Sequence, residues 1–187
     1  MTPYFQGKLY RAKLAIVGDT TVGKTAMVQM FTSDGGKFPK AYNMTFAPEV
    51  VTKRIPIHNT EDSVELLIYD SPGTDLYENY LNKFWNKPHL LLYVFDSTNP
   101  KTLDSVEGRW VKLVSSCDWF HGRPTASAIF GNKTDMPDRD CTDDQGEAVA
   151  SRLGSKYFWG SAKDNQGLDE VFYYLAEEFH KFSKRQD

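Results

Sequence analysis

The sequence predicts an α/β fold, a mostly parallel sheet of six strands with one antiparallel edge, in which about five helices cover the two faces. Strand patterns alternate with helical patterns along the chain, which is typical of parallel sheets. Two runs, 90–95 and 126–130, are almost continuously apolar, as in strands buried on both faces. The 187 residues, 40% of them hydrophobic, suffice for one domain, and we expect residues 1–187 to form it, with flexible ends at 1–7 and 184–187.

The first half of the chain is expected to hold three strands and two helices. In order, the elements are the strand 8–17, the helix 24–31, a loop at 33–46, the strands 49–57 and 64–69, and the helix 77–85. The first strand alternates and then becomes solidly apolar, whereas the first helix has apolar residues at helical spacing. Gly35, Gly36 and Pro39 favour the loop. The two later strands flank a polar turn, which indicates a hairpin.

The second half alternates strands and helices regularly. In order, the elements are the strand 90–95, the helix 102–116, the strand 126–130, the helix 143–153, the strand 156–159 and the helix 168–182. The last helix is amphipathic, with Val171, Phe172, Leu175 and Phe179 on one face. Parallel strands joined in this way bind ligands at their carboxyl ends, so we expect a site there.

Composition excludes several classes of function. A net charge of −3 predicts neither nucleic-acid binding nor strong attraction to anionic membranes. Cys117 and Cys141 have no metal-ligand or C-x-x-C spacing, which fits a reducing compartment. No run approaches the roughly 18 apolar residues of a membrane span. Thr2 follows Met1 and no cysteine lies near Asp187, so no lipid anchor is expected.

The residues from Gly18 to Thr25 read G-x-x-x-x-G-K-T between a strand and a helix, which is the context of a phosphate-binding loop. Backbone N–H groups of such a loop and the N-terminus of its helix attract phosphate. Lys24 would reach the β- and γ-phosphates, and the hydroxyl of Thr25 would ligate Mg²⁺. The nucleotide-binding residues expected on this loop are Asp19, Thr20, Thr21, Val22, Gly23, Lys24, Thr25 and Ala26.

Three further motifs each follow a predicted strand. After 64–69, Asp70 is expected to hold Mg²⁺ through water, and the N–H of Gly73 to bond a γ-phosphate. After 126–130, the carboxylate of Asp135 can accept two hydrogen bonds from guanine, whereas adenine offers no such donor pair. After 156–159, backbone N–H groups at 160–163 can bond the guanine oxygen. The base-reading residues expected are Asn132, Lys133, Asp135, Ser161, Ala162 and Lys163.

These four motifs, in this order, resemble those of the Ras-superfamily small GTPases over essentially the whole chain. The resemblance implies the three-layer fold of that superfamily, GTP or GDP as the bound nucleotide and Mg²⁺ as the cofactor. Residues 42–47 look like the Rab form of switch one, in which Tyr42 would contact the nucleotide and Thr45 would ligate Mg²⁺ when a γ-phosphate is present. Phe38 sits where the family packs an aromatic edge on guanine; the alternative is an ordinary loop anchor.

Within the superfamily, residues 32–42 and 62–66 are similar to the intraflagellar transport protein 27 family of Rab-like GTPases. That resemblance implies a place in the cytoplasm and in the cilium or flagellum and its base. It implies a small β-sandwich subunit and other transport-complex subunits as partners, with the last helix, which carries Tyr173 and Tyr174, at the docking surface. The absence of a lipid anchor agrees with a subunit of a soluble complex.

The chain departs from the family pattern where GTP is hydrolysed to GDP and phosphate. Thr74 stands where most active members have a glutamine that orients the attacking water, and it is too short to do so. Pro72 stiffens the same turn, and Thr20 adds bulk to the phosphate loop. We expect slow hydrolysis, with Lys24 and Gly73 as the other catalytic positions. The alternatives are a constitutively GTP-bound structural subunit, a Rab-type vesicle-trafficking switch, and an ATPase or nucleotide kinase, which Asp135 argues against.

Overall fold

The computed structural model describes residues 7–40, 45, 47–74, 78–117 and 125–186. Within them, six strands form one sheet in the order β2-β3-β1-β4-β5-β6, and only the β2–β3 pairing is antiparallel. The strands are β1 (Leu9–Val17), β2 (Glu49–Pro56), β3 (Ser63–Asp70), β4 (Leu90–Asp96), β5 (Ala126–Asn132) and β6 (Lys156–Trp159). This topology confirms the predicted fold class.

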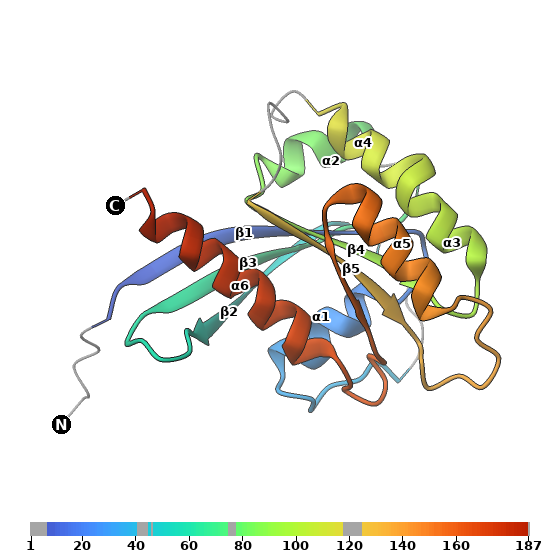
Figure 1. Ribbon diagram of the computed structural model, residues 1–187, viewed down its shortest axis with the longest axis horizontal. Coiled ribbons are helices and arrows are strands. Elements are labelled where there is room, and N and C mark those ends of the chain that lie inside the picture. Colours follow the sequence, from blue (N-terminus) through green and yellow to red (C-terminus); the bar gives the residue numbers. More distant parts are fainter. Residues whose placement is uncertain (1–6, 41–44, 46, 75–77, 118–124, 187) are drawn as a thin grey trace.

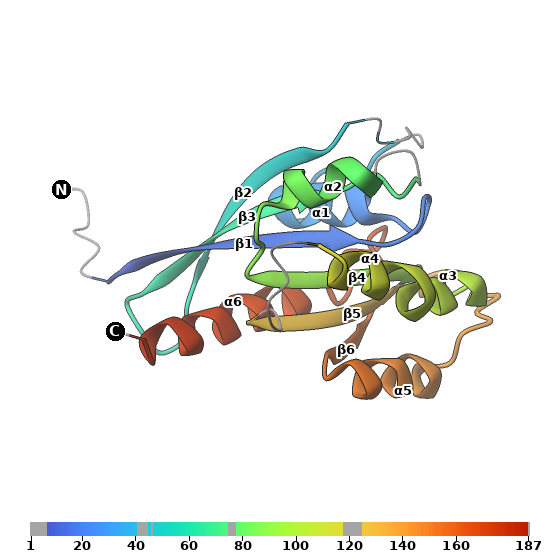
Figure 2. The ribbon, with the colours of Figure 1, turned by 90° about the horizontal axis from the view of Figure 1, so that it is seen from above.

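Helices cover both faces of the sheet (Figures 1 and 2). They are α1 (Lys24–Thr32), α2 (Glu78–Trp85), α3 (Pro100–Ser105), the π-helical turn η2 (Val106–Trp110), α4 (Val111–Ser115), α5 (Asp143–Leu153) and α6 (Leu168–Lys184). Because α3, η2 and α4 follow one another without a break, the described residues form five helical units, as expected. One apolar core joins α1 and α6 to the sheet, and a second joins α2, α3, η2, α4 and α5 to it.

The burial of the strands explains why their apolar patterns could be recognised in the sequence. Every residue of β4 is buried, which matches its continuous apolar run. On the face covered by α1 and α6, the rings of Phe31 and Phe172 stack with their centroids 3.9 Å apart. On the opposite face, Trp85 of α2 and Trp110 of η2 are fully buried. The sheet is therefore held from both sides by aromatic side chains, which fixes the strand ends that carry the motifs.

The structure differs from the predicted elements at several boundaries. Strands β3 and β5 extend to Asp70 and Asn132, so these motif residues are the last residues of their strands. The predicted helix 102–116 begins at Pro100 and contains the π-helical turn η2, which its sequence pattern did not reveal. Helix α6 continues two residues past its predicted end at 182, and Lys184 contacts Asp62. Flexibility of the chain ends stays a prediction.

The start of β1 and the end of α6 lie at the same end of the sheet (Figures 1 and 2). Asp62 joins them, because its carboxylate accepts a hydrogen bond from Lys8 N at 2.8 Å and pairs with His180 Nε2 at 2.8 Å. This cluster lies at the opposite end of the strands from the motifs. Across the described residues, none of the helices combines the length and the apolar character that crossing a bilayer requires.

Candidate functional site

The phosphate loop connects the end of β1 to the first turn of α1. Its backbone has positive φ angles at Thr21 (65°) and Gly23 (99°), so it curls before the helix begins. A Cβ atom on Gly23 would lie 2.3 Å from Nδ2 of Asn132, which is why only glycine fits there. Val22 between them is fully buried and anchors the loop in the core. The curled backbone and the helix N-terminus form the arrangement that binds phosphate.

Lys24 is buried at the centre of this loop. Its ammonium donates hydrogen bonds to the carbonyl oxygens of Gly18 at 2.8 Å and Asp19 at 2.7 Å. Burial lowers the pKa of Lys24 to about 8, although the carboxylates of Asp70 and Asp19 oppose the shift. Phosphate groups beside this ammonium would favour its charged form and replace the carbonyl partners. The loop is therefore built around a buried cation, which an anionic ligand would stabilise.

Three oxygen-bearing side chains from separate segments converge beside the loop. The hydroxyl of Thr25 donates to Oδ2 of Asp70 at 2.6 Å and lies 2.8 Å from the hydroxyl of Thr45. Asp70 is buried, and its Oδ1 has no hydrogen-bond partner within the described residues. Burial raises the pKa of this carboxyl above its usual value. Hydroxyl and carboxylate oxygens are ligands that Mg²⁺ prefers, so this donor set fits the expected cation or its water shell.

The turn that follows Asp70 lies directly against the phosphate loop. A Cβ atom on Gly73 would lie 2.4 Å from the backbone nitrogen of Thr20, so the two backbones meet where only a glycine fits. Trp85 Nε1 donates to the hydroxyl of Ser71 at 2.7 Å and ties the turn to α2. Thr74 is half-buried, and its hydroxyl has no partner among the described residues. The turn is therefore closely packed against the phosphate loop at Gly73, whereas the hydroxyl of the next residue is left without a hydrogen bond in the described part of the chain.

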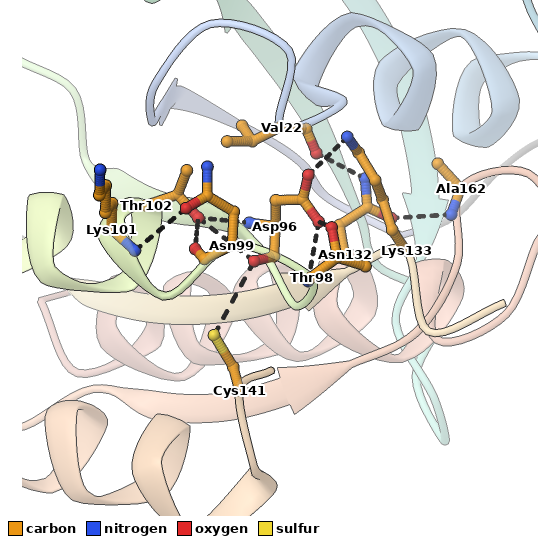
Figure 3. A network of polar contacts seen from close by, with 10 residues as sticks. All are labelled: Val22, Asp96, Thr98, Asn99, Lys101, Thr102, Asn132, Lys133, Cys141 and Ala162. Atoms are coloured by element: carbon orange, nitrogen blue, oxygen red, sulfur yellow. Dashed lines mark hydrogen bonds and ion pairs between the residues drawn. The ribbon is translucent and has the colours of Figure 1, made fainter. Parts of the chain in front are cut away.

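Asn132 connects the phosphate loop to the second base-reading loop (Figure 3). Its Nδ2 donates to the carbonyl oxygen of Val22 at 2.8 Å, and its Oδ1 accepts from the backbone nitrogen of Ala162 at 2.9 Å. Both bonds are buried, so the amide is fixed in one orientation. Asn132 therefore holds the two predicted ligand-binding loops together.

Asp135 is held by the loop that begins at Ser161. The Ser161 hydroxyl donates to Oδ1 at 2.6 Å, and Lys163 Nζ lies 3.4 Å from Oδ2. Burial alone would raise the pKa of Asp135, but the hydrogen bonds from Ser161 and Lys163 outweigh it and leave the pKa below its usual value. The carboxylate is thus ionised and oriented, and each oxygen keeps acceptor capacity for a base edge.

Asp96 contacts the predicted base-reading residue Lys133 and was not among the residues predicted from the sequence. Its Oδ2 accepts a hydrogen bond from Lys133 Nζ at 2.6 Å, and its Oδ1 accepts from the backbone and hydroxyl of Thr98 at 2.9 and 2.7 Å (Figure 3). Asp96 ends β4 and pairs in register with Asn132 at the end of β5. That register is the signal that could have identified it, because parallel neighbours that end in polar residues face the same ligand.

The other predicted residues are less closely tied to the site. Phe38 lies in the loop after α1 with 44% of its surface exposed, and its contact with a base stays a prediction. Tyr42 lies outside the described residues. On α6, Tyr173 is exposed, whereas Tyr174 is half-buried with its ring centroid 5.3 Å from that of Phe158. Two residues of η2 that the sequence did not single out, Arg109 and Trp110, both contact Asp19.

Comparison with known proteins agrees with this geometry. The family model described as the Ras family matches residues 13–181. The chain is 38% identical over 170 residues to the intraflagellar transport protein 27 homolog of Bos taurus, a match that covers 90% of each chain. It is 35% identical over 176 residues to the homolog of Homo sapiens, covering 94% of this chain and 93% of that one.

A more distant relative is the Ras-related protein SEC4 of Saccharomyces cerevisiae, which is 29% identical over 174 residues, or 91% of this chain and 77% of that one. The family match spans all four motifs, and the two higher identities span nearly the whole chain. The chain belongs to the Ras family of small GTPases and, within it, to the group of intraflagellar transport protein 27 homologues.

Proposed function

We propose that this protein is a guanine-nucleotide-binding, Rab-like subunit of intraflagellar transport that hydrolyses GTP slowly. The observation that carries guanine binding is the carboxylate of Asp135, ionised and oriented by Ser161 and Lys163. A base with two adjacent N–H donors satisfies this carboxylate, whereas adenine leaves it unpaired, so GTP should compete with bound nucleotide and ATP should not. The names of the relatives support the transport role.

In this proposal Mg²⁺ is held by Thr25 and Thr45 and, through water, by Asp70. When bound there, Mg²⁺ would supply positive charge that offsets the charge of the phosphates. Lys24 gives up its carbonyl partners to phosphate oxygens, and the backbone N–H groups of residues 19–26 orient the phosphate chain. Lys133 and Ala162 complete the base pocket, with Phe38 and Tyr42 as further predicted contacts.

Slow hydrolysis is expected because position 74 holds a threonine and not the glutamine of most active family members. A threonine hydroxyl ends close to the backbone, so it cannot reach a water molecule in line with the last phosphate as a glutamine amide can. Thr20 is half-buried on the phosphate loop, where its methyl and hydroxyl restrict the approach of an activating arginine from a partner. Lys24 and Gly73 would still contact the transferring group, so hydrolysis is expected to be slow rather than absent.

Single-turnover hydrolysis of GTP loaded with Mg²⁺ tests this proposal. The yardstick is the intrinsic rate of Ras, roughly 3–5 × 10⁻⁴ s⁻¹. We expect a rate well below it, and an increase in the Thr74→Gln variant. A wild-type rate at or above the yardstick would contradict the role given to Thr74, as would a Thr74→Gln variant no faster than wild type. A wild-type rate too slow to measure would favour the constitutively GTP-bound subunit.

The transport role places the protein in the cytoplasm and in the cilium or flagellum and its base, with a small β-sandwich subunit and other complex subunits as partners. Exposure of Tyr173 on α6 supports that helix as part of the docking surface. The double substitution of Tyr173 and Tyr174 by alanine should weaken partner binding. Undiminished binding would exclude these two tyrosines from the docking surface. A Rab-type vesicle-trafficking switch is the alternative function.

A further inference from the structure

Arg109 links two loops of the site that are far apart in the sequence. Its Nη1 lies 3.3 Å from Oδ1 of Asp19 on the phosphate loop and 3.5 Å from the carbonyl oxygen of Gly73. The side chain of Arg109 is 27% exposed and that of Asp19 is 20% exposed, so the ion pair is partly shielded from water. One cation therefore contacts both the loop that cradles phosphates and the turn that lies against it.

The π-helical turn η2 brings this cation into place. In a regular α-helix, consecutive side chains project about 100° apart. Here the consecutive residues Arg109 and Trp110 both contact Oδ1 of Asp19, with Trp110 Nε1 donating at 2.8 Å. The guanidinium carbon also lies 4.5 Å from the centre of the Trp110 ring. A π-helical turn inside a helix is often found at a functional site, and this one faces the phosphate loop.

Gly73 is the residue whose position Arg109 can control. Its backbone packs against residues 19 and 20 so closely that a Cβ atom would lie 2.4 Å from atoms of both. Arg109 bonds the carbonyl oxygen of Gly73, and therefore holds the peptide unit from the side of η2. Beside this contact is a cavity of about 580 Å³, whose lining includes Thr20, Thr74 and Arg109. The turn at Gly73 thus has open space on one side, and a cationic anchor that opposes its movement.

We propose that Arg109 is a positioning residue that holds Gly73 against the phosphate loop and thereby favours the GTP-bound form over the GDP-bound form; this inference rests on the proposed function. In GTPases the turn carrying this glycine is ordered by the γ-phosphate and is released after hydrolysis. A contact that favours the ordered position adds to the affinity for the ligand that requires that position and not to the affinity for the other. Such a bias suits a subunit that retains GTP.

A purely structural role for Arg109 predicts a different result. If the guanidinium only joined η2 to the phosphate loop through Asp19, its loss would loosen the loop that both nucleotides share. GTP and GDP would then be weakened equally. The ratio of the two affinities therefore separates positioning of Gly73 from general support of the fold, whatever the change in stability.

The experiment measures dissociation constants for GDP and for the non-hydrolysable analogue GppNHp, each with Mg²⁺, in wild type, Arg109→Ala and Arg109→Lys. We expect Arg109→Ala to lose about tenfold in affinity for GppNHp relative to GDP, the size expected for one hydrogen bond to a charged group. Lysine keeps the charge but not the fork of donors, so Arg109→Lys should fall between. It also keeps the test open if the alanine variant does not fold.

Glu107→Gln is the matched control. Glu107 lies in the same π-helical turn but pairs with Arg152 of α5, at 2.7 Å, rather than with the site. We expect its affinity ratio to equal that of wild type. Equal weakening of both nucleotides in the Arg109 variants, or no change in either, would overturn the inference and leave the proposed function standing. A wild-type chain that bound neither nucleotide would overturn both.

Discussion

The carboxylates at the two ends of the site differ in how completely they are satisfied. At the base-reading end, Ser161 and Lys163 already hold both oxygens of Asp135. At the phosphate end, Oδ1 of Asp70 has no hydrogen-bond partner within the described residues. The pKa of Asp135 lies below its usual value and that of Asp70 above it. Under the proposed function, the Asp135 carboxylate is therefore preorganised to select the base, whereas a bound cation would complete the environment of the Asp70 carboxylate.

The largest effect is expected from Asp135→Ala, which removes the preorganised acceptor. Guanine N–H donors would then be desolvated without partners, and GTP affinity should fall by about 10³-fold or more. The preference for GTP over ATP should fall with it, as measured by competition against a fluorescent guanine nucleotide. Asp138→Ala is the control, since Asp138 is exposed and is expected to leave affinity unchanged. Retained selectivity in Asp135→Ala would disprove the assignment of this end.

A smaller effect is expected at the phosphate end from Thr25→Ala. Loss of one Mg²⁺ ligand should weaken cation binding at least about tenfold, as disturbance of metal sites commonly does. In wild type, removal of Mg²⁺ with EDTA should speed GDP release; in the variant, release should already be fast and respond little to EDTA. Thr32→Ala on the same helix is the control, because its hydroxyl bonds the carbonyl oxygen of Val28 away from the site. An EDTA response in Thr25→Ala as large as that of wild type would exclude Thr25 as a ligand.

Asp96→Asn should have a still smaller and nucleotide-independent effect. Asparagine can keep the acceptor for Thr98 but loses the charge that fixes Lys133. We expect GTP and GDP to be weakened by a similar factor of about 3 to 10, since a charged hydrogen bond is replaced by a neutral one. Asp104→Asn, an exposed position on α3, controls for the change in net charge. A variant that weakened only GTP would assign Asp96 to the phosphate end instead.

Many of the residues at the two ends of the site could be predicted from the sequence, because local patterns mark where strands end. Thr25 and Asp70 were assigned from motifs that follow apolar strands, and the structure places their side chains 2.6 Å apart. The hydrogen bonds of Asp135 could not be predicted in this way, since Ser161 and Lys163 reach it through the packing of β5 against β6. Motifs identify which residues take part, but the sheet register decides which of them touch.

The π-helical turn η2 is a clearer example of a feature that the sequence pattern did not predict. Residues 102–116 have a helical pattern, and that pattern does not reveal the π-helical turn at 106–110. Arg109 and Asp19 are 90 positions apart, and no motif relates them. Contacts of this kind follow from tertiary structure alone, which is why the sequence analysis named Asp19 but not its partners.

The pKa of Asp70 offers the last and smallest test, in which Asp70→Asn is compared with wild type in EDTA and excess GDP, so that GDP stays bound while Mg²⁺ is absent. Because burial raises the pKa of this carboxyl in the folded protein, ionisation costs folding stability. That cost is absent below the unfolded pKa of about 3.9 and grows as the pH rises through the folded pKa. The variant should therefore melt above wild type at pH 7, with the difference shrinking toward pH 4. Adding Mg²⁺ should reverse the order at pH 7, because the cation stabilises the carboxylate and not the amide. A variant less stable than wild type at pH 7 in EDTA would mean that the phosphate end is as well satisfied as the base-reading end.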